Sequence, residues 1–143
     1  MRIVVVGDFH MNKRKPELSY LAMEDVRGIS PDLVVPLGDF GTGSEIGSVK
    51  GLEEAYALLG AIGAPLRPIL GNHDLQRESG PEGQPHGVME TALRQMYELE
   101  SAYGFIEFER FRLMFASTEP QPKETCYQVQ ECYVTDAQFA VLQ

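Results

Sequence analysis

A chain of 143 residues with 43% hydrophobic residues is long enough to bury a core and too apolar to be disordered. Its formal net charge of −9, from 21 acidic and 12 basic side chains, excludes the basic footprint that nucleic-acid binding requires and disfavours anionic membranes. We therefore expect a single globular domain over residues 1–143 with no nucleic-acid partner.

The two cysteines and the beginning of the chain predict a cytoplasmic protein. Cys126 and Cys132 have no zinc-ligand spacing and make no disulfide framework, so we expect two free thiols, with a disulfide between them as the alternative. No apolar run approaches the roughly 20 residues of a membrane span. The chain enters an apolar segment directly, without the basic and long apolar regions of a leader, unless one has been removed.

The first half of the sequence predicts alternating strands and helices. Short apolar runs rich in β-branched residues predict buried strands at 3–6, 33–37 and 66–70, although prolines weaken the second and the third. A helix opens at Pro16 and stops at Ser30, and its apolar stripe is Leu18, Leu21, Ala22, Val26 and Ile29. A second helix, ending near Gly63, is expected to bury Leu52, Ala55, Tyr56, Leu59 and Ile62. This order is typical of a layered α/β domain.

The second half of the sequence lacks this regular alternation of strands and helices. Residues 76–87 are polar and rich in glycine and proline, which predicts a long surface loop. Apolar spacing then predicts a helix over 89–99, and alternation predicts a hairpin from 103–108 and 111–116. A last helix is expected over 136–142, capped by Thr135.

Each of the three predicted strands ends in a glycine followed by polar residues that can bind metals. Asp8, Asp39 and Asn72 come directly after these glycines, and His10 and His73 lie beside them. The carboxyl ends of parallel strands meet at one edge of a sheet, where ligands bind. Each cluster alone is weak evidence, since an Asp after a glycine often only caps a turn. No single structural role explains why a polar cluster stands at each of the three strand ends. Together, the three clusters therefore predict a metal site.

The ligand types narrow the choice of cation. Carboxylate, imidazole and amide ligands suit manganese, iron, zinc or cobalt better than calcium, which prefers oxygen cages. A carboxylate can bridge two ions about 3.5–4 Å apart, the separation used in phosphoryl transfer. Asp39 lies on the middle one of the three segments in sequence, so it is the natural candidate for the carboxylate that bridges the two ions.

These motifs resemble those of the calcineurin-like metallophosphoesterases. The matching strings are Asp8-Phe9-His10, Gly38-Asp39 and Gly71-Asn72-His73-Asp74, of which the last is the most specific. The resemblance covers nearly the whole chain. It implies an α/β fold, the layered α/β/β/α sandwich of metallophosphoesterases.

The resemblance also implies roles for individual residues. Asp8 and His10 would hold a first divalent ion, Asp39 would bridge two ions, and Asn72 would hold the second. Manganese, iron or zinc would be the cofactor. His73 would stabilise the transferring group or protonate the leaving oxygen, and Asp74 would orient its imidazole.

Two departures from the family pattern affect these expectations. Thr42 stands where many members have a second, supporting Asp. In the family, a lone His and a Gly-His-x-His motif complete the coordination spheres of both metals, and neither has a counterpart in this chain. The only other histidine, His86, lies in the polar loop. We therefore expect an amino-terminal portion whose sandwich is incomplete because the carboxy-terminal half is missing. Its bare apolar faces would favour a homo-oligomer or a complementing carboxy-terminal fragment.

The sequence resembles cyclic-nucleotide and general phosphodiesterases more than phosphoprotein phosphatases. Phosphatases usually have Gly where this chain has Met11, and Glu in place of Asp74. The predicted hairpin followed by a helix with Gln138 and Leu142 is similar to a diesterase pattern.

The leading functional prediction is a metal-dependent hydrolase that cleaves phosphate mono- or diesters with metal-activated water at a dinuclear centre. Its substrate would be a small phosphoester. The alternative is a catalytically incomplete module that binds metal weakly or binds a partner protein. A nucleotide-binding domain without metal is a weaker third option, because no Gly-x-Gly-x-x-Gly or Walker-type loop is present.

Overall fold

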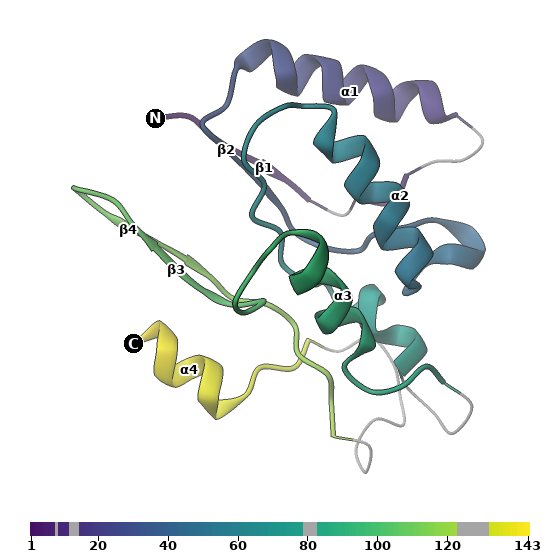
Figure 1. Ribbon diagram of the computed structural model, residues 1–143, viewed down its shortest axis with the longest axis vertical. Coiled ribbons are helices and arrows are strands. Elements are labelled where there is room, and N and C mark those ends of the chain that lie inside the picture. Colours follow the sequence, from purple (N-terminus) through teal and green to yellow (C-terminus); the bar gives the residue numbers. More distant parts are fainter. Residues whose placement is uncertain (8, 12–14, 79–82, 123–131) are drawn as a thin grey trace.

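The computed structural model of the chain describes residues 1–7, 9–11, 15–78, 83–122 and 132–143. It has a mixed α/β architecture, which confirms the expected fold class (Figure 1). Its elements in chain order are β1 (Ile3–Val6), α1 (Pro16–Ile29), β2 (Leu33–Pro36), the 3-10 helix η1 (Gly43–Glu45), α2 (Val49–Gly60), the 3-10 helix η2 (His73–Glu78), α3 (Val88–Met96), β3 (Gly104–Glu107), β4 (Arg112–Phe115) and α4 (Asp136–Leu142).

Strand β2 lies at the centre of the domain. It pairs in parallel with β1, from Ile3 opposite Leu33 to Val6 opposite Pro36. All four residues of β2 are buried, which agrees with its continuous apolar run. The parallel pairing brings the carboxyl ends of β1 and β2 to the same edge of the sheet.

The predicted third strand, 66–70, runs parallel to β2 on the side away from β1, but it forms only an isolated bridge there. The backbone N–H of Arg67 donates to Val34 O at 2.9 Å, and that of Ile69 donates to Pro36 O at 3.1 Å. A continuous ladder would also need an N–H from residue 36, and proline has none. The prediction of a regular strand is therefore wrong in detail, although the segment occupies the expected place.

Helices α2 and α3 form the main core together with one face of the sheet. The buried members of this core include Val34, Leu52, Leu59, Met89 and Leu93. The predicted buried face of α2 is confirmed except at Tyr56, which is 43% exposed. Ser48 caps α2 by accepting a hydrogen bond from Gly51 N at 3.0 Å.

The predicted apolar stripe of α1 is mostly exposed, and Val26 is its one member that packs against the core. Leu18, Leu21 and Ile29 are exposed, and the buried residue of this helix is Met23. Because Met23 and the half-buried Val26 provide the contact with the core, most of the leucine stripe is left in solvent. The predicted end of α1 is confirmed, since Ser30 adopts a left-handed conformation at the C-cap.

The predicted hairpin is confirmed as the antiparallel pair β3 and β4. Phe115 at its base packs with Leu33 and Val35, while Val34 belongs to the helix-covered core. The two faces of β2 are thus covered by different layers, helices on one and the base of the hairpin on the other. The rest of the hairpin extends away from the helices, and α4 lies beside it (Figure 1).

Two further predictions concern segments that flank these layers. The polar stretch 76–87 is not all loop, because η2 continues to Glu78, which is buried. The carboxylate of Glu78 accepts hydrogen bonds from Gly87 N and Met89 N and so caps α3. Helix α4 begins at Asp136 with Thr135 as its cap, as predicted. None of the described helices has the length and apolarity needed to cross a membrane.

Candidate metal centre

The site is built on two glycine turns that touch each other. Gly38 follows β2 with a φ of +87°, and a Cβ added there would lie 2.0 Å from Gly71 N. A Cβ on Gly71 would lie 2.3 Å from Oδ1 of Asp39. Only glycine allows this approach, so the two turns present the residues that follow them to one small volume. Asp39 itself has a φ of +57°, a conformation that is uncommon outside glycine and frequent at functional sites.

Three of the predicted site residues converge there. Ring nitrogens of His10 and His73 and a carboxylate oxygen of Asp39 lie within 4.8 Å of one another. The two imidazoles meet edge to face, with ring centroids 5.5 Å apart and an interplanar angle of 74°. All three side chains are half-buried. The sequence prediction that separate strand ends meet at this point is confirmed for these residues.

The hydrogen bonds around the cluster fit a divalent cation. Nδ1 of His10 lies 3.2 Å from the carbonyl oxygen of Gly41. Since a carbonyl can only accept, Nδ1 carries the proton and the lone pair is on Nε2, as in metal-binding histidines. Oδ1 of Asp39 accepts the backbone N–H of His73 at 3.0 Å, which fixes the carboxylate beside both rings. An oriented carboxylate and two imidazoles are a suitable donor set for manganese, iron or zinc.

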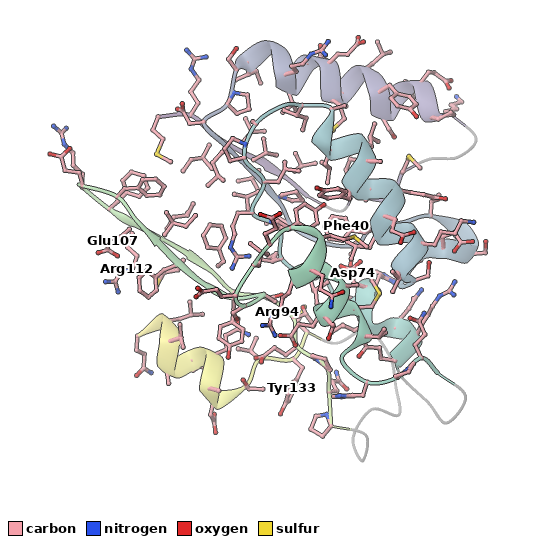
Figure 2. All side chains as sticks on the ribbon, in the orientation of Figure 1. Phe40, Asp74, Arg94, Glu107, Arg112 and Tyr133 are labelled. Carbon is pink, nitrogen blue, oxygen red and sulfur yellow. The ribbon has the colours of Figure 1, made fainter. Side chains whose placement is uncertain are left out.

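Asp74 is fully buried and holds the two turns together. Its Oδ2 accepts hydrogen bonds from Asp39 N and Gly71 N, both at 2.8 Å, and its Oδ1 accepts from Phe40 N at 2.7 Å. Figure 2 shows Asp74 beside Phe40 in the interior. Burial raises the pKa of Asp74 to about 7, whereas the three amide donors act in the opposite direction.

The expected contact between Asp74 and the imidazole of His73 is not formed. The carboxylate is occupied by backbone amides, and Nδ1 of His73 instead lies 3.2 Å from Oε1 of Gln76. Sequence reasoning missed Gln76. The available signal was its spacing, because residues i and i+3 of a 3-10 turn lie on the same side.

Of the remaining predicted residues, Asp8 lies outside the described part of the chain, as does Cys126. Asn72 is half-buried on the turn between Gly71 and His73, and its carbonyl accepts from Leu75 N. His86 is exposed, with Nε2 at 2.6 Å from the carbonyl oxygen of Gln121.

Comparison with known proteins identifies the family. The family model described as calcineurin-like phosphoesterase matches residues 1–126. Neither the curated proteins nor the solved structures gave a match. The matched region includes both glycine turns, the His10–Asp39–His73 cluster, η2 and the hairpin. Because the match covers most of its length, the chain belongs to the calcineurin-like phosphoesterase family.

Proposed function

We propose that this protein is a metal-dependent phosphoesterase that hydrolyses small phosphate mono- or diesters. The observation that carries the proposal is the meeting of His10, Asp39 and His73 at the turns that follow β1, β2 and the segment 66–70. Membership of the phosphoesterase family supports the same reaction class.

Asp8, His10, Asp39 and Asn72 would hold two divalent cations, with Asp39 as the bridge. When bound, the cations would activate water and neutralise charge on the phosphoryl oxygens. The protein's contribution is the fixed orientation of the ligands. Gly41 O orients His10 and the N–H of His73 orients Asp39, so little reorganisation is needed when a cation or substrate arrives.

His73 is proposed as the group that donates a proton to the leaving oxygen. Its imidazole faces His10 edge to face and lies beside the Asp39 carboxylate, so it would be adjacent to the cations. Nδ1 is occupied by Gln76, which leaves Nε2 as the nitrogen for this transfer. Asp74 would contribute by fixing the backbone turns and not by touching the substrate.

We further propose a preference for diesters. The resemblance to diesterases rests on Met11 and Asp74 in the motifs and on a hairpin followed by a helix with a Gln. The pairing of β3 with β4 and the buried Gln138 of α4 support this pattern.

The test is hydrolysis of bis(p-nitrophenyl) phosphate and p-nitrophenyl phosphate by the purified chain with and without manganese. We expect metal-dependent turnover that Asp39→Asn abolishes. With methyl phenyl phosphate as a third substrate, whose leaving oxygen needs a proton, His73→Gln should slow turnover by about 100-fold or more, and it should slow the nitrophenyl esters much less. Asp25→Asn and His86→Gln are matched controls, since both residues are exposed and lie outside the cluster. They should retain full activity.

The alternative, a non-catalytic module, makes a different prediction in the same experiment. Calorimetry would then detect manganese binding that depends on Asp39, while no phosphoester is turned over in excess metal.

A further inference from the structure

Gln76 connects the imidazole of His73 to the loop that follows η1. On one side, its Oε1 lies 3.2 Å from Nδ1 of His73. On the other side, its Nε2 donates to the carbonyl oxygen of Ile46 at 3.3 Å. Both contacts are half-buried and come from a single side chain on η2.

These two contacts determine which nitrogen of His73 carries the proton. A backbone carbonyl only accepts, so the NH₂ group of Gln76 must face Ile46 and its oxygen must face His73. An amide oxygen also only accepts. Nδ1 of His73 must therefore be the donor, and the lone pair of the neutral ring is on Nε2.

The carbonyl of Ile46 is itself held in place. Nε of Arg77 donates to it at 2.7 Å, and a second guanidinium nitrogen bonds to Ser44 O. The neighbouring Gly47 packs closely against η2, because a Cβ there would lie 2.8 Å from His73 O and 3.1 Å from Cγ of Gln76. The acceptor that orients the Gln76 amide is thus part of a tightly packed contact between η2 and the η1 loop.

We propose that Gln76 is a positioning residue that holds His73 with its proton on Nδ1 and directs Nε2 to the reaction. The catalytic part rests on the function proposed above. As the bond from phosphorus to the leaving oxygen breaks, that oxygen takes the proton from Nε2 of the imidazolium. His73 then returns to the neutral ring, with Nδ1–H still donating to Gln76.

The structural half is tested without metal or substrate, by long-range ¹H–¹⁵N correlation NMR of the full metal-free chain. The chain has three histidines, so His73→Gln and His86→Gln assign the ring signals. For the neutral His73 ring we expect a protonated Nδ1 and an unprotonated Nε2. Gln76→Ala should shift His73 toward the Nε2–H form, whereas Gln95→Ala, on the exposed side of α3, should change nothing.

Gln76→Glu keeps an acceptor oxygen for Nδ1 and should preserve the wild-type form, which guards against misreading a folding defect. The proposal is overturned if the neutral wild-type ring carries its proton on Nε2. It is also overturned if folded Gln76→Ala retains the wild-type signature.

The catalytic half is tested by leaving-group dependence. With methyl p-nitrophenyl phosphate, whose leaving group needs little protonation, Gln76→Ala should be close to wild type. With a phenyl or alkyl leaving group, kcat should fall about 10-fold or more at unchanged KM, and Gln76→Glu should restore most of it. An equal loss on both substrates overturns this half. A wild-type chain without any turnover overturns the proposed function, and the NMR result still decides the role of Gln76.

Discussion

Among individual residues, Asp74 has the clearest structural effect on the site. One buried carboxylate accepts three backbone N–H groups, from Asp39, Phe40 and Gly71. These amides belong to turns about thirty residues apart in sequence, and without the carboxylate they would be buried without partners. Asp74 therefore sets the distance between the turn that carries Asp39 and the turn that carries His73.

Asp74→Asn should destabilise the metal-free chain by about 2–3 kcal/mol. The asparagine has one acceptor oxygen, and its NH₂ group would face a backbone N–H that it cannot bond, which leaves a buried donor unsatisfied. The measurement is urea unfolding at pH 8, above the pKa of about 7, where the wild-type carboxylate is ionised and accepts all three bonds. Because burial raises this pKa, ionisation itself costs folding free energy, so the wild-type chain should gain stability as the pH falls below about 7, and Asp74→Asn should lack this gain. Asp25→Asn on the exposed surface of α1 should stay within about 0.5 kcal/mol. Equal stability of the two variants would contradict the role given to Asp74.

The site residues differ in how far sequence could predict them. The sequence predicted His10, Asp39 and His73 because an apolar run, a glycine and a polar ligand follow one another within a few residues. The partners of Asp74 and Gln76 could not be read in this way. Backbone amides of another turn and the carbonyl of Ile46 have no signature in the side-chain sequence, and only folding brings them near.

Among the elements, α4 is attached to the domain by a buried polar side chain as well as by its contact with β3. Gln138 is fully buried, and its Oε1 accepts from Ser117 N at 2.8 Å. Its Nε2 donates to Ser117 O at 2.9 Å and to a carboxylate oxygen of Glu119 at 2.7 Å. Ser117 in turn uses its Oγ to accept from Leu70 N, next to the glycine turn. This chain of hydrogen bonds connects α4 to the segment that ends at the site.

Gln138→Ala should release α4 while leaving the sheet intact. The loss of three hydrogen bonds, two of them buried, leaves the N–H and carbonyl of Ser117 without partners. Most apolar residues of α4 are exposed and cannot compensate. Hydrogen exchange followed by mass spectrometry should show lost protection over 136–142 and retained protection over 33–36. Unchanged exchange in α4, or loss of protection throughout the sheet, would contradict this picture. Gln95→Ala is the control.

Element prediction failed where local pattern and tertiary contact disagree. The helix α1 was predicted in the right place, but its leucine stripe faces solvent because Met23 makes the core contact. The third strand has the right position and direction, yet Pro36 lacks the N–H that would continue its ladder. Apolar spacing identifies elements reliably here, whereas the face that is buried depends on neighbours that only the folded chain supplies.

For the molecule as a whole, charge and cation binding are linked. The chain has a net charge of −9, so divalent cations are attracted to much of its surface as well as to the cluster. A cation bound specifically by His10 and Asp39, beside His73, would bind only the folded chain, because these residues come from separate segments. Such binding stabilises the fold by mass action, by about 2.7 kcal/mol when the cation is at 100 times its Kd.

Manganese should therefore raise the unfolding midpoint of the wild-type chain and should not raise that of Asp39→Asn beyond a small screening effect. Asp25→Asn removes the same charge from an exposed position and should respond as the wild type does. The measurement is thermal unfolding across a manganese titration at constant ionic strength, followed by chelation to reverse the shift. If Asp39→Asn and Asp25→Asn gain equally, the cations act on the acidic surface at large, and the cluster is not a specific site. If only Asp39→Asn fails to respond, the specific contribution equals the difference between the two titration curves, which gives the Kd of the site without any assay of turnover.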